Sequence, residues 1–269
     1  MSPEVAVPGL EAVLVALDGG VATVTLNQPE KRNALSTPMV RDLLAAFAWC
    51  ATDPGVRVVV LTGAGDRAFC AGADLATAFD AEAGELERHH GRRSIAELFL
   101  ALRDLGKPVL GRINGHALAG GFGLACACDI LLAVESASFG TPEINVGVWP
   151  MMISAVLARN LPRKVVLEMM LLGDRWTAAQ LKDAGLVSRV AANLEELDRQ
   201  TAEVASKLAR KSPAILRLGR DAFYRMEDMS LEEALAFLHS QLTLVALTED
   251  TKEGIRAFFE KREPEFKGR

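Results

Sequence analysis

Residues 56–62 read Val-Arg-Val-Val-Val-Leu-Thr, and Gly63-Ala64-Gly65-Asp66 follows directly. A β-branched run that is apolar at consecutive positions predicts a strand covered on both faces, because a half-exposed strand would alternate apolar and polar residues. The glycine-rich turn predicts the end of that strand. The stretch therefore predicts a strand in the centre of a sheet that is covered on both faces.

Two shorter β-rich runs precede the central strand. They cover residues 12–17 and 21–26, and Asp18-Gly19-Gly20 between them is a strong hairpin signal, so we expect an antiparallel pair. Thr37 followed by Pro38 predicts an N-cap and a first helical residue, because apolar residues then recur at helical spacing.

Strand, turn and helix succeed one another again further along the chain. Residues 108–113 lead into a helical pattern at 120–126, and residues 130–133 form another strand pattern, with a later helix from Ser154. Repeated crossovers of this kind predict an α/β protein.

Strand signals stop at about Asn193. Four helical patterns follow, at residues 194–211, 213–226, 231–247 and 251–261. We therefore expect two regions, a core at 1–193 and a helical region at 194–269. The third helix carries an apolar stripe, which predicts either packing on the chain's own core or a subunit interface; its residues are Leu231, Leu235, Leu238, Leu242 and Val245.

Composition narrows the classes of function. The chain has 269 residues, half of them apolar, and a formal net charge of −5, so one large core is expected and a nucleic-acid partner is not. The first ten residues do not resemble a signal peptide, and no apolar stretch is long enough to cross a membrane. We expect no membrane association and a cytoplasmic location.

The four cysteines lie in apolar or Gly/Ala-rich surroundings, which favours reduced thiols. Cys126-Ala127-Cys128 could indicate a metal, but no second thiol pair or histidine follows at ligand spacing. We expect no metal site.

Two segments rich in glycine and alanine follow strands, at residues 69–75 and 115–123. Small residues allow a ligand to approach the backbone closely. If Gly120 begins a helix, its N–H has no acceptor within that helix and can face a developing negative charge. That arrangement is half of an oxyanion hole.

A third segment, residues 139–144, places Glu143 among apolar neighbours. Such a setting would disfavour the ionised carboxylate and raise its pKa, which suits proton transfer near neutral pH. A surface glutamate is the alternative.

Glycine-rich turns that open helices also bind dinucleotides. Gly121-Phe122-Gly123 begins like that fingerprint, and Glu143 lies about where a ribose-binding acid would stand. Cys126 occupies the place of the third small residue, however, and the segment falls in the middle of the chain. An NAD-dependent oxidoreductase is the weaker alternative.

The ordered motifs at residues 27–36, 71–75 and 114–121 resemble those of the crotonase, or enoyl-CoA hydratase/isomerase, superfamily, and the likeness runs from about Asn27 to Lys261. The resemblance implies an acyl-CoA substrate, with coenzyme A as part of the substrate and no separate cofactor. It implies that the amides of Ala73 and Gly120 hold the thioester oxygen. It also implies coenzyme A or acyl contacts at Lys31, Arg32, Ala34, Leu35, Ala71, Gly72, Asp74, Leu75 and Gly121.

The same resemblance implies a spiral of ββα units with a helical C-terminal trimerisation region, as a homotrimer or a dimer of trimers. It further implies that Phe258 and Lys261 reach the coenzyme A of a neighbouring subunit. Without the resemblance, ordinary helix packing and a partner for the helix dipole would account for these two residues.

The chain departs from the hydratase pattern at one position. Hydratases of this family use two glutamates; Glu143 matches the second, whereas Gly123 stands at the first. We expect a hydratase-type enzyme, with isomerisation by the single Glu143 or acyl-CoA binding without catalysis as alternatives. Asp74, His116 or a residue of loop 80–90 could supply the missing group.

Bulky residues follow Glu143 in the segment Trp149-Pro150-Met151-Met152. Their apolar side chains would line or shorten an acyl pocket, and Trp149 is the contact that we predict there. Packing of the core beneath Glu143 is the alternative.

Overall fold

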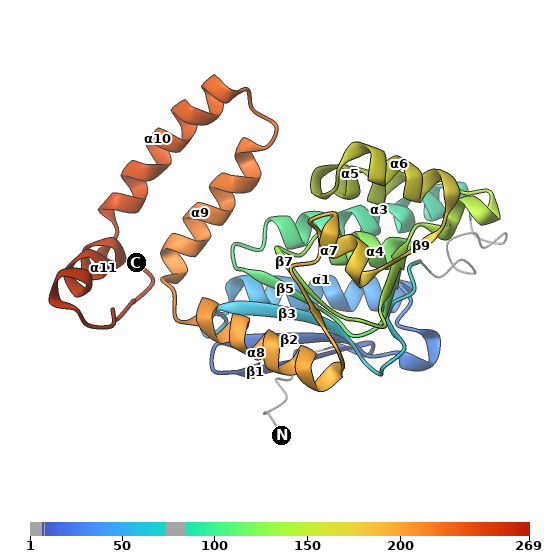
Figure 1. Cartoon of the computed structure of the whole chain (residues 1–269), viewed down its shortest axis with the longest axis horizontal. Coiled ribbons are helices and arrows are strands. Elements are labelled where there is room, and N and C mark those ends of the chain that lie inside the picture. The colour runs from blue at the N-terminus through green and yellow to red at the C-terminus, as the bar shows by residue number, and fades with distance from the viewer. Residues whose placement is uncertain (1–6, 8, 74–83) are drawn as a thin grey trace.

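The computed structural model describes residue 7, residues 9–73 and residues 84–269, and its strands form two sheets flanked by helices (Figure 1). Among the described residues, six strands make the larger sheet, in the order β1-β2-β3-β5-β7-β10. Their bounds are β1 Val13–Asp18, β2 Val21–Leu26, β3 Val58–Gly63, β5 Val109–Ile113, β7 Ile130–Val134 and β10 Arg189–Ala191.

The predicted hairpin and central strand are both confirmed. Strands β1 and β2 pair antiparallel, whereas β2, β3, β5, β7 and β10 pair in parallel. All six residues of β3 are buried. Val58 and Val60 pack against one helix, while Val59 and Leu61 belong to the main core on the opposite face. Because a strand alternates its side chains, burial of every residue requires cover on both faces.

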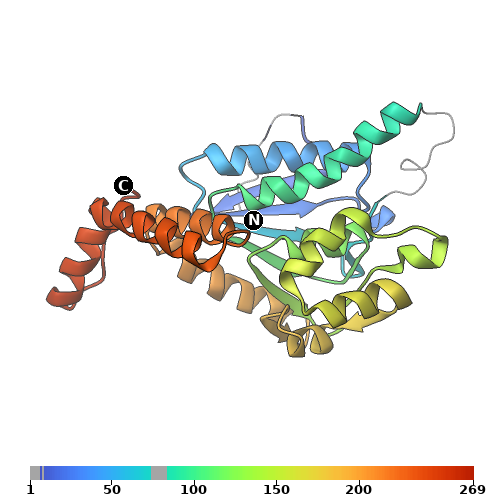
Figure 2. The same cartoon turned by 90° about the horizontal axis from the view of Figure 1, so that it is seen from above.

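A smaller sheet has the described strand order β4-β6-β8-β9, with bounds β4 Ala68–Cys70, β6 His116–Leu118, β8 Ser138–Gly140 and β9 Arg175–Thr177. Strands β3, β5 and β7 lie in the larger sheet, and each is followed along the chain by a strand of the smaller sheet and then by a helix. The chain is therefore a spiral of ββα units, as expected (Figure 2).

The helices cover the sheets and extend beyond them (Figure 1). Their bounds are α1 Thr37–Thr52, α3 Glu85–Arg103, α4 Gly120–Cys126, α5 Met151–Asn160, α6 Arg163–Leu172, α7 Ala178–Asp183, α8 Leu194–Ala209, α9 Pro213–Met226, α10 Leu231–Leu247 and α11 Glu249–Glu260, with short 3₁₀ helices η1 Pro29–Lys31 and η2 Pro142–Val146.

Three predicted helix starts are wrong, one of them that of α11, which begins at Glu249 rather than at Thr251. Ser36, not Thr37, caps α1, because Ser36 has extended backbone angles and its hydroxyl accepts a hydrogen bond from the Met39 N–H at 3.4 Å. Helix α5 begins at Met151 rather than at Ser154, directly after Pro150, so Met151 and Met152 form its first turn.

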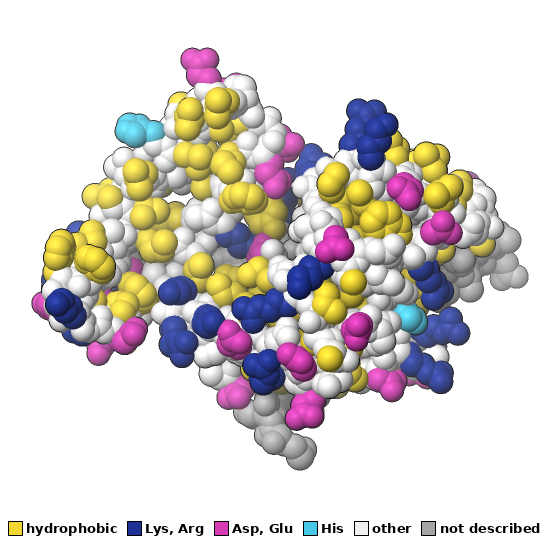
Figure 3. All heavy atoms as spheres, viewed as in Figure 1, with side chains coloured by type: hydrophobic (Ala, Val, Ile, Leu, Met, Phe, Trp, Pro, Cys, Tyr) yellow, Lys and Arg dark blue, Asp and Glu magenta, His cyan; other side chains and the backbone are white. Residues whose placement is uncertain are grey.

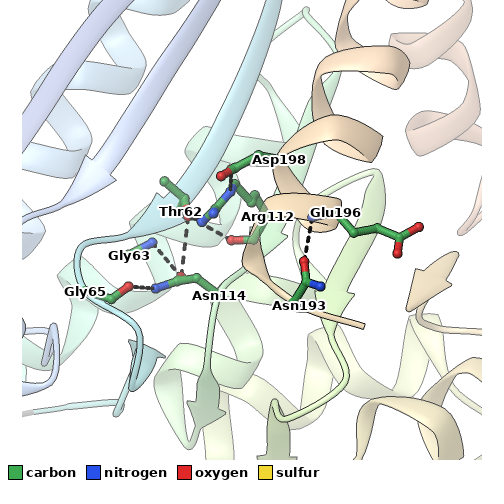
Figure 4. Close-up of polar contacts among 8 residues, drawn as sticks. All are labelled: Thr62, Gly63, Gly65, Arg112, Asn114, Asn193, Glu196 and Asp198. Carbon is green, nitrogen blue, oxygen red and sulfur yellow. Dashed lines mark hydrogen bonds and ion pairs between the residues drawn. The ribbon is translucent and has the colours of Figure 1, made fainter. Parts of the chain in front are cut away.

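Helix α8 packs on the larger sheet, although the boundary that we predicted at residue 193 assigns it to the helical region. Ala205 and Ala209 contact the cluster of Val58 and Val60. Near the start of the helix, the Arg112 guanidinium of β5 donates to Asp198 at 2.6 Å (Figure 4). The part of the chain that stands away from the sheets begins with α9.

Helices α9, α10 and α11 form an arm that projects from the sheets in both views (Figures 1 and 2). Arg220 of α9 connects the arm to the rest of the protein. Its buried guanidinium pairs with Asp129 and donates to the carbonyl oxygens of Leu102 and Arg103, both at 2.6 Å. Helix α10 has no buried residue. The apolar stripe of α10 therefore does not pack on the chain's own core, and that alternative is wrong.

All four cysteines are buried and unpaired. Among residues 9–73 and 84–269, no helix is long and apolar enough to span a bilayer.

Candidate active site

The turn that opens α4 has an unusual backbone. Ala119 has a φ of 51° and a ψ of −129°, a region that residues other than glycine rarely adopt. Its N–H donates to the Gly140 carbonyl at 2.8 Å, and its carbonyl accepts from the N–H groups of Phe122 and Gly123. These bonds hold a conformation that costs roughly 1–3 kcal/mol, and Gly120 becomes the first residue of the helix.

A second backbone amide lies against this turn. The Leu35 N–H donates to the Gly72 carbonyl at 2.8 Å, which positions Ala73. A Cβ added at Gly120 would lie 3.6 Å from the Ala73 nitrogen, and one added at Gly72 would lie 3.1 Å from the Gly120 nitrogen. Within the described ranges, neither nitrogen donates a hydrogen bond to the protein. The structure thus brings together two free N–H groups, which suit one anionic oxygen.

Gly72 makes the close approach possible. It has a φ of 93°, and a Cβ there would lie 2.6 Å from the Cβ of Ala119. A side chain would therefore push the two amides apart, and the left-handed conformation would be strained as well.

Two buried asparagines fix the loop between β3 and β4, which leads into the segment that carries Ala73. The Asn33 side chain donates to the carbonyl oxygens of Ala64 at 3.0 Å and Ala68 at 2.9 Å. The Asn114 side chain donates to the Gly65 carbonyl at 2.8 Å and accepts from the Gly63 N–H at 3.1 Å (Figure 4). We did not identify either asparagine as an anchor from the sequence, where both are merely parts of motifs.

Glu143 lies in η2, close to the same turn in the fold, because the Gly140 carbonyl three residues earlier accepts from Ala119. The buried Thr141 hydroxyl, which donates to the Met169 carbonyl at 2.9 Å, fixes the start of η2. The Oε2 of Glu143 is buried and, among the described residues, has no hydrogen-bond partner. Burial raises the pKa of the carboxyl above its usual value.

Gly123 faces an apolar wall. A Cβ at this position would lie 2.5 Å from Cγ2 of Ile153 and 2.9 Å from Cζ of Phe99. Both side chains are buried. An acidic side chain has no room there, and nothing in the sequence marks Ile153 or Phe99 as part of a site.

Comparison with known proteins adds the decisive observation. A model of the family described as enoyl-CoA hydratase/isomerase matches residues 17–269. The chain belongs to this family, within the crotonase superfamily.

Named relatives act on coenzyme A thioesters. The chain is 36% identical to the 2,3-dehydroadipyl-CoA hydratase of Escherichia coli K12, covering 97% of this chain and 100% of that one. It is 35% identical to the carnitinyl-CoA dehydratase of Proteus mirabilis, covering 93% and 96%. A crystal structure of an enoyl-CoA hydratase from Mycobacterium smegmatis superposes with a TM-score of 0.91, at 35% identity and with 95% and 99% coverage. The chain is a hydratase-type enzyme of this family.

The other residues expected from the enoyl-CoA hydratase resemblance lie in different places. Lys31 and Arg32 are exposed at the end of η1, and Ala34 follows them toward Leu35. The Arg32 carbonyl accepts from the Ala71 N–H at 3.0 Å, which ties the two predicted coenzyme A loops together. Asp74 and Leu75 lie outside the described residues.

Three further candidates take part in internal packing. A Cβ at Gly121 would run into the carbonyl of Cys70, so Gly121 allows α4 to pack on β4. The space beside Gly123 is likewise filled by the side chains of Ile153 and Phe99, so a dinucleotide's pyrophosphate could not approach the glycine there. Trp149 is half-buried against the main core.

Phe258 and Lys261 are not brought to this site. Phe258 lies on α11 and Lys261 caps it, at the outer end of the arm, on the other side of the molecule from α4 (Figures 1 and 2). Phe258 is 78% exposed.

Of the residues considered for the missing acid or base, His116 hydrogen-bonds through Nδ1 to the Ser138 hydroxyl at 2.9 Å. Burial, with Arg175 and Arg32 nearby, lowers the pKa of His116. Within the described ranges, no group of three or more histidine, cysteine or acidic residues could hold a metal ion. The predicted loop 80–90 lies partly outside the described residues, and from Glu85 it is the first part of α3.

The contact between Gly72 and Ala119 predicts a sharp mutational effect. Gly72→Ala should lower kcat about 10²–10³-fold, the loss typical of one oxyanion-hole donor, because the new methyl group separates the amides. Gly185→Ala is the matched control, since Gly185 has a φ of 87° but nothing within 4 Å of the added Cβ. Steady-state kinetics of the two purified variants would make the comparison; equal losses of activity would show that backbone strain alone is responsible.

Proposed function

We propose that this enzyme adds water to the double bond of a 2-enoyl-CoA thioester, with Glu143 as the carboxylate that moves the proton. The observation that carries the proposal is the buried, unpartnered Oε2 of Glu143, on a segment bonded to the turn that presents Gly120 N–H. In this proposal coenzyme A arrives as part of the substrate, and no separate cofactor takes part.

The two amides of Ala73 and Gly120 supply the electrostatic part of catalysis. Both donate to the thioester oxygen, and both bonds strengthen as that oxygen becomes an enolate. Interactions that are stronger in the transition state than in the ground state raise kcat. Neither donor has to move, because the Ala119 turn and the Gly72 contact already hold them.

In this proposal Glu143 alone carries out both proton transfers, from water and to C2. The carboxylate takes a proton from water as the water oxygen bonds to C3, and the electrons of the double bond move onto the thioester oxygen. Glu143 then returns that proton to C2 as the carbonyl re-forms, so the carboxylate is regenerated. Since one group handles both steps, hydroxyl and hydrogen should arrive on the same face of the substrate.

Double-bond migration is the second candidate, and the wall at Gly123 favours it. Ile153 and Phe99 occupy the space that a second carboxylate would need. A single carboxylate suffices to carry a proton between C2 and C4 of a dienolate held by the same two amides.

The oligomeric state belongs to the same proposal. We infer a homotrimer or a dimer of trimers, in which α10 and α11 meet a neighbouring copy. Apolar side chains gather over this part of the arm (Figure 3), and patches of this kind mark interaction sites. Phe258 and Lys261 would then contact coenzyme A bound by the neighbour. We also propose a reducing, cytoplasmic setting, which suits four unpaired thiols.

Incubation with crotonyl-CoA or a 3-enoyl-CoA in heavy water tests the reaction. We expect hydration of crotonyl-CoA with one deuterium at C2, and a loss of about 10²–10⁴-fold in Glu143→Gln, the usual contribution of general acid–base catalysis. Glu135→Gln, at an exposed glutamate after β7, should leave the rate unchanged. Migration without hydration would favour the isomerase, and binding without turnover would contradict both reactions.

The raised pKa of Glu143 predicts opposite effects on activity and stability. As a base the carboxyl must be ionised, so kcat/KM should fall on acidification with a midpoint above the value of roughly 4.3 for an exposed glutamate. The raised pKa also means that ionisation destabilises the folded state, so stability is lost as pH rises through that pKa. Glu143→Gln should therefore gain stability relative to wild type at pH 7, and less of it at pH 4, in urea unfolding. An equal difference at both pH values would contradict the assignment.

Substitutions on α10 test the assembly. Leu235 is 59% exposed and Leu242 65% exposed, and replacing both with lysine should reduce the mass in sedimentation toward that of one 28.9 kDa chain. Leu171→Lys is the control, because Leu171 is equally exposed but lies on α6. A wild-type protein that sediments as a monomer would contradict the trimer.

A further inference from the structure

The wall beside Gly123 continues the surface that begins at the paired amides. Gly120 and Gly123 are three residues apart on α4, so their Cα substituents point to similar sides of the helix. At Gly120 that direction meets Leu35 and the Ala73 nitrogen, and at Gly123 it meets Ile153 and Phe99. An acyl group whose thioester oxygen sits on the amides would therefore extend along α4 toward Ile153 and Phe99.

A cavity of about 940 Å³, which is open to solvent, lies beyond this wall, between α9 and the parts of α3, α4 and α5 that face it. Phe99 is part of the wall beside Gly123 and also lines the cavity. Its ring tip packs over Gly123 on one side, and the residue lines the cavity on the other, while only 8% of it is exposed. At the far end of α4, Cys126 also lines the cavity.

The helix sets the distance from the paired amides to Phe99. Three residues separate Gly120 from Gly123, which is about 4.5 Å of helical rise. That length suits a short acyl group such as crotonyl. The three atoms nearest to a side chain at position 123 are all carbons of Ile153 and Phe99. A carboxylate at the end of the acyl group would lose its water there without gaining a partner.

We propose that Phe99 determines substrate specificity by closing the acyl pocket against the cavity, so that the enzyme accepts short, apolar acyl groups. The proposal rests on the proposed function, because it assumes that acyl-CoA binds with its thioester on the two amides. It distinguishes this chain from its relative in Escherichia coli, whose named substrate, 2,3-dehydroadipyl-CoA, ends in a carboxylate.

The test compares crotonyl-CoA with 2-dodecenoyl-CoA in the intact enzyme. Wild type should prefer crotonyl-CoA, and Phe99→Ala should raise the ratio of kcat/KM for dodecenoyl-CoA over crotonyl-CoA at least tenfold. Each methylene that leaves water for an apolar cavity is worth roughly fourfold in binding, so a few additional methylenes are enough. The milder Phe99→Leu should shift the ratio in the same direction, and it serves if Phe99→Ala does not fold.

Gly219 offers a matched control. It lines the cavity from α9, and nothing lies within 4 Å of a Cβ added there. Gly219→Leu alone should leave crotonyl-CoA turnover unchanged, because Phe99 keeps that substrate out of the cavity. Combined with Phe99→Ala, it should narrow the cavity and reduce the gain for the long substrate.

Two outcomes would overturn the proposal. One is a wild-type enzyme that handles dodecenoyl-CoA as well as crotonyl-CoA, and the other is an unchanged ratio in both Phe99 variants. Calorimetric titration with butyryl-CoA and dodecanoyl-CoA, which have no double bond, separates this failure from failure of the proposed reaction. If binding shows the chain-length shift but no variant turns over substrate, the proposed reaction is wrong and the role of Phe99 stands.

Discussion

The close approach of two backbone segments at Gly72 and Ala119 is the constraint on which the site depends. One segment follows β4 and the other follows β6, and these strands are neighbours in the smaller sheet. Their parallel pairing brings both ends to the same edge, where only a residue without a Cβ fits at position 72. The bond from Ala119 N–H to Gly140 then extends the arrangement to the next strand and to Glu143. The smaller sheet therefore positions both the two oxyanion-hole amides and the Glu143 carboxylate.

The ββα spiral explains why this sheet is rigid. Each turn of the spiral places one strand in the larger sheet, whose centre is buried on both faces, and the next strand in the smaller sheet. The buried asparagines Asn33 and Asn114 bond to the loop between β3 and β4 from two sides. A buried amide that bonds through both its nitrogen and its oxygen resists displacement, because any shift would leave a polar atom unsatisfied. These bonds therefore fix the loop that leads from β3 into β4, the strand that Ala73 follows.

Much of this could be predicted from local sequence, and the rest could not. The valine run of β3, the Asp18-Gly19-Gly20 turn and the alternation of strands and helices depend on near neighbours in the chain, and all were recognised. The contacts of Gly123 depend on Phe99 and Ile153, which lie on two other helices and carry no motif. The exposure of α10 also depends on tertiary structure, because an apolar stripe has the same spacing whether it packs on its own core or on another molecule. Asp74 and Leu75 were named as substrate contacts from a resemblance, and the described residues do not reach them.

The side chains that leave no room for a second carboxylate also make the surroundings of α4 apolar. Ile153 and Phe99 are apolar and buried, so they add nothing that would solvate a charge near α4. In such surroundings a hydrogen bond to an enolate oxygen is stronger than in water, and an ionised carboxylate is costlier. Both consequences favour a site in which one carboxylate takes up and returns a proton while two amides stabilise the negative charge on the substrate oxygen. A second acidic group at position 123 would add a like charge, and like charges raise each other's pKa. Ile153 and Phe99, which lie on two other helices, therefore leave room only for glycine at position 123 and so exclude a second carboxylate from it.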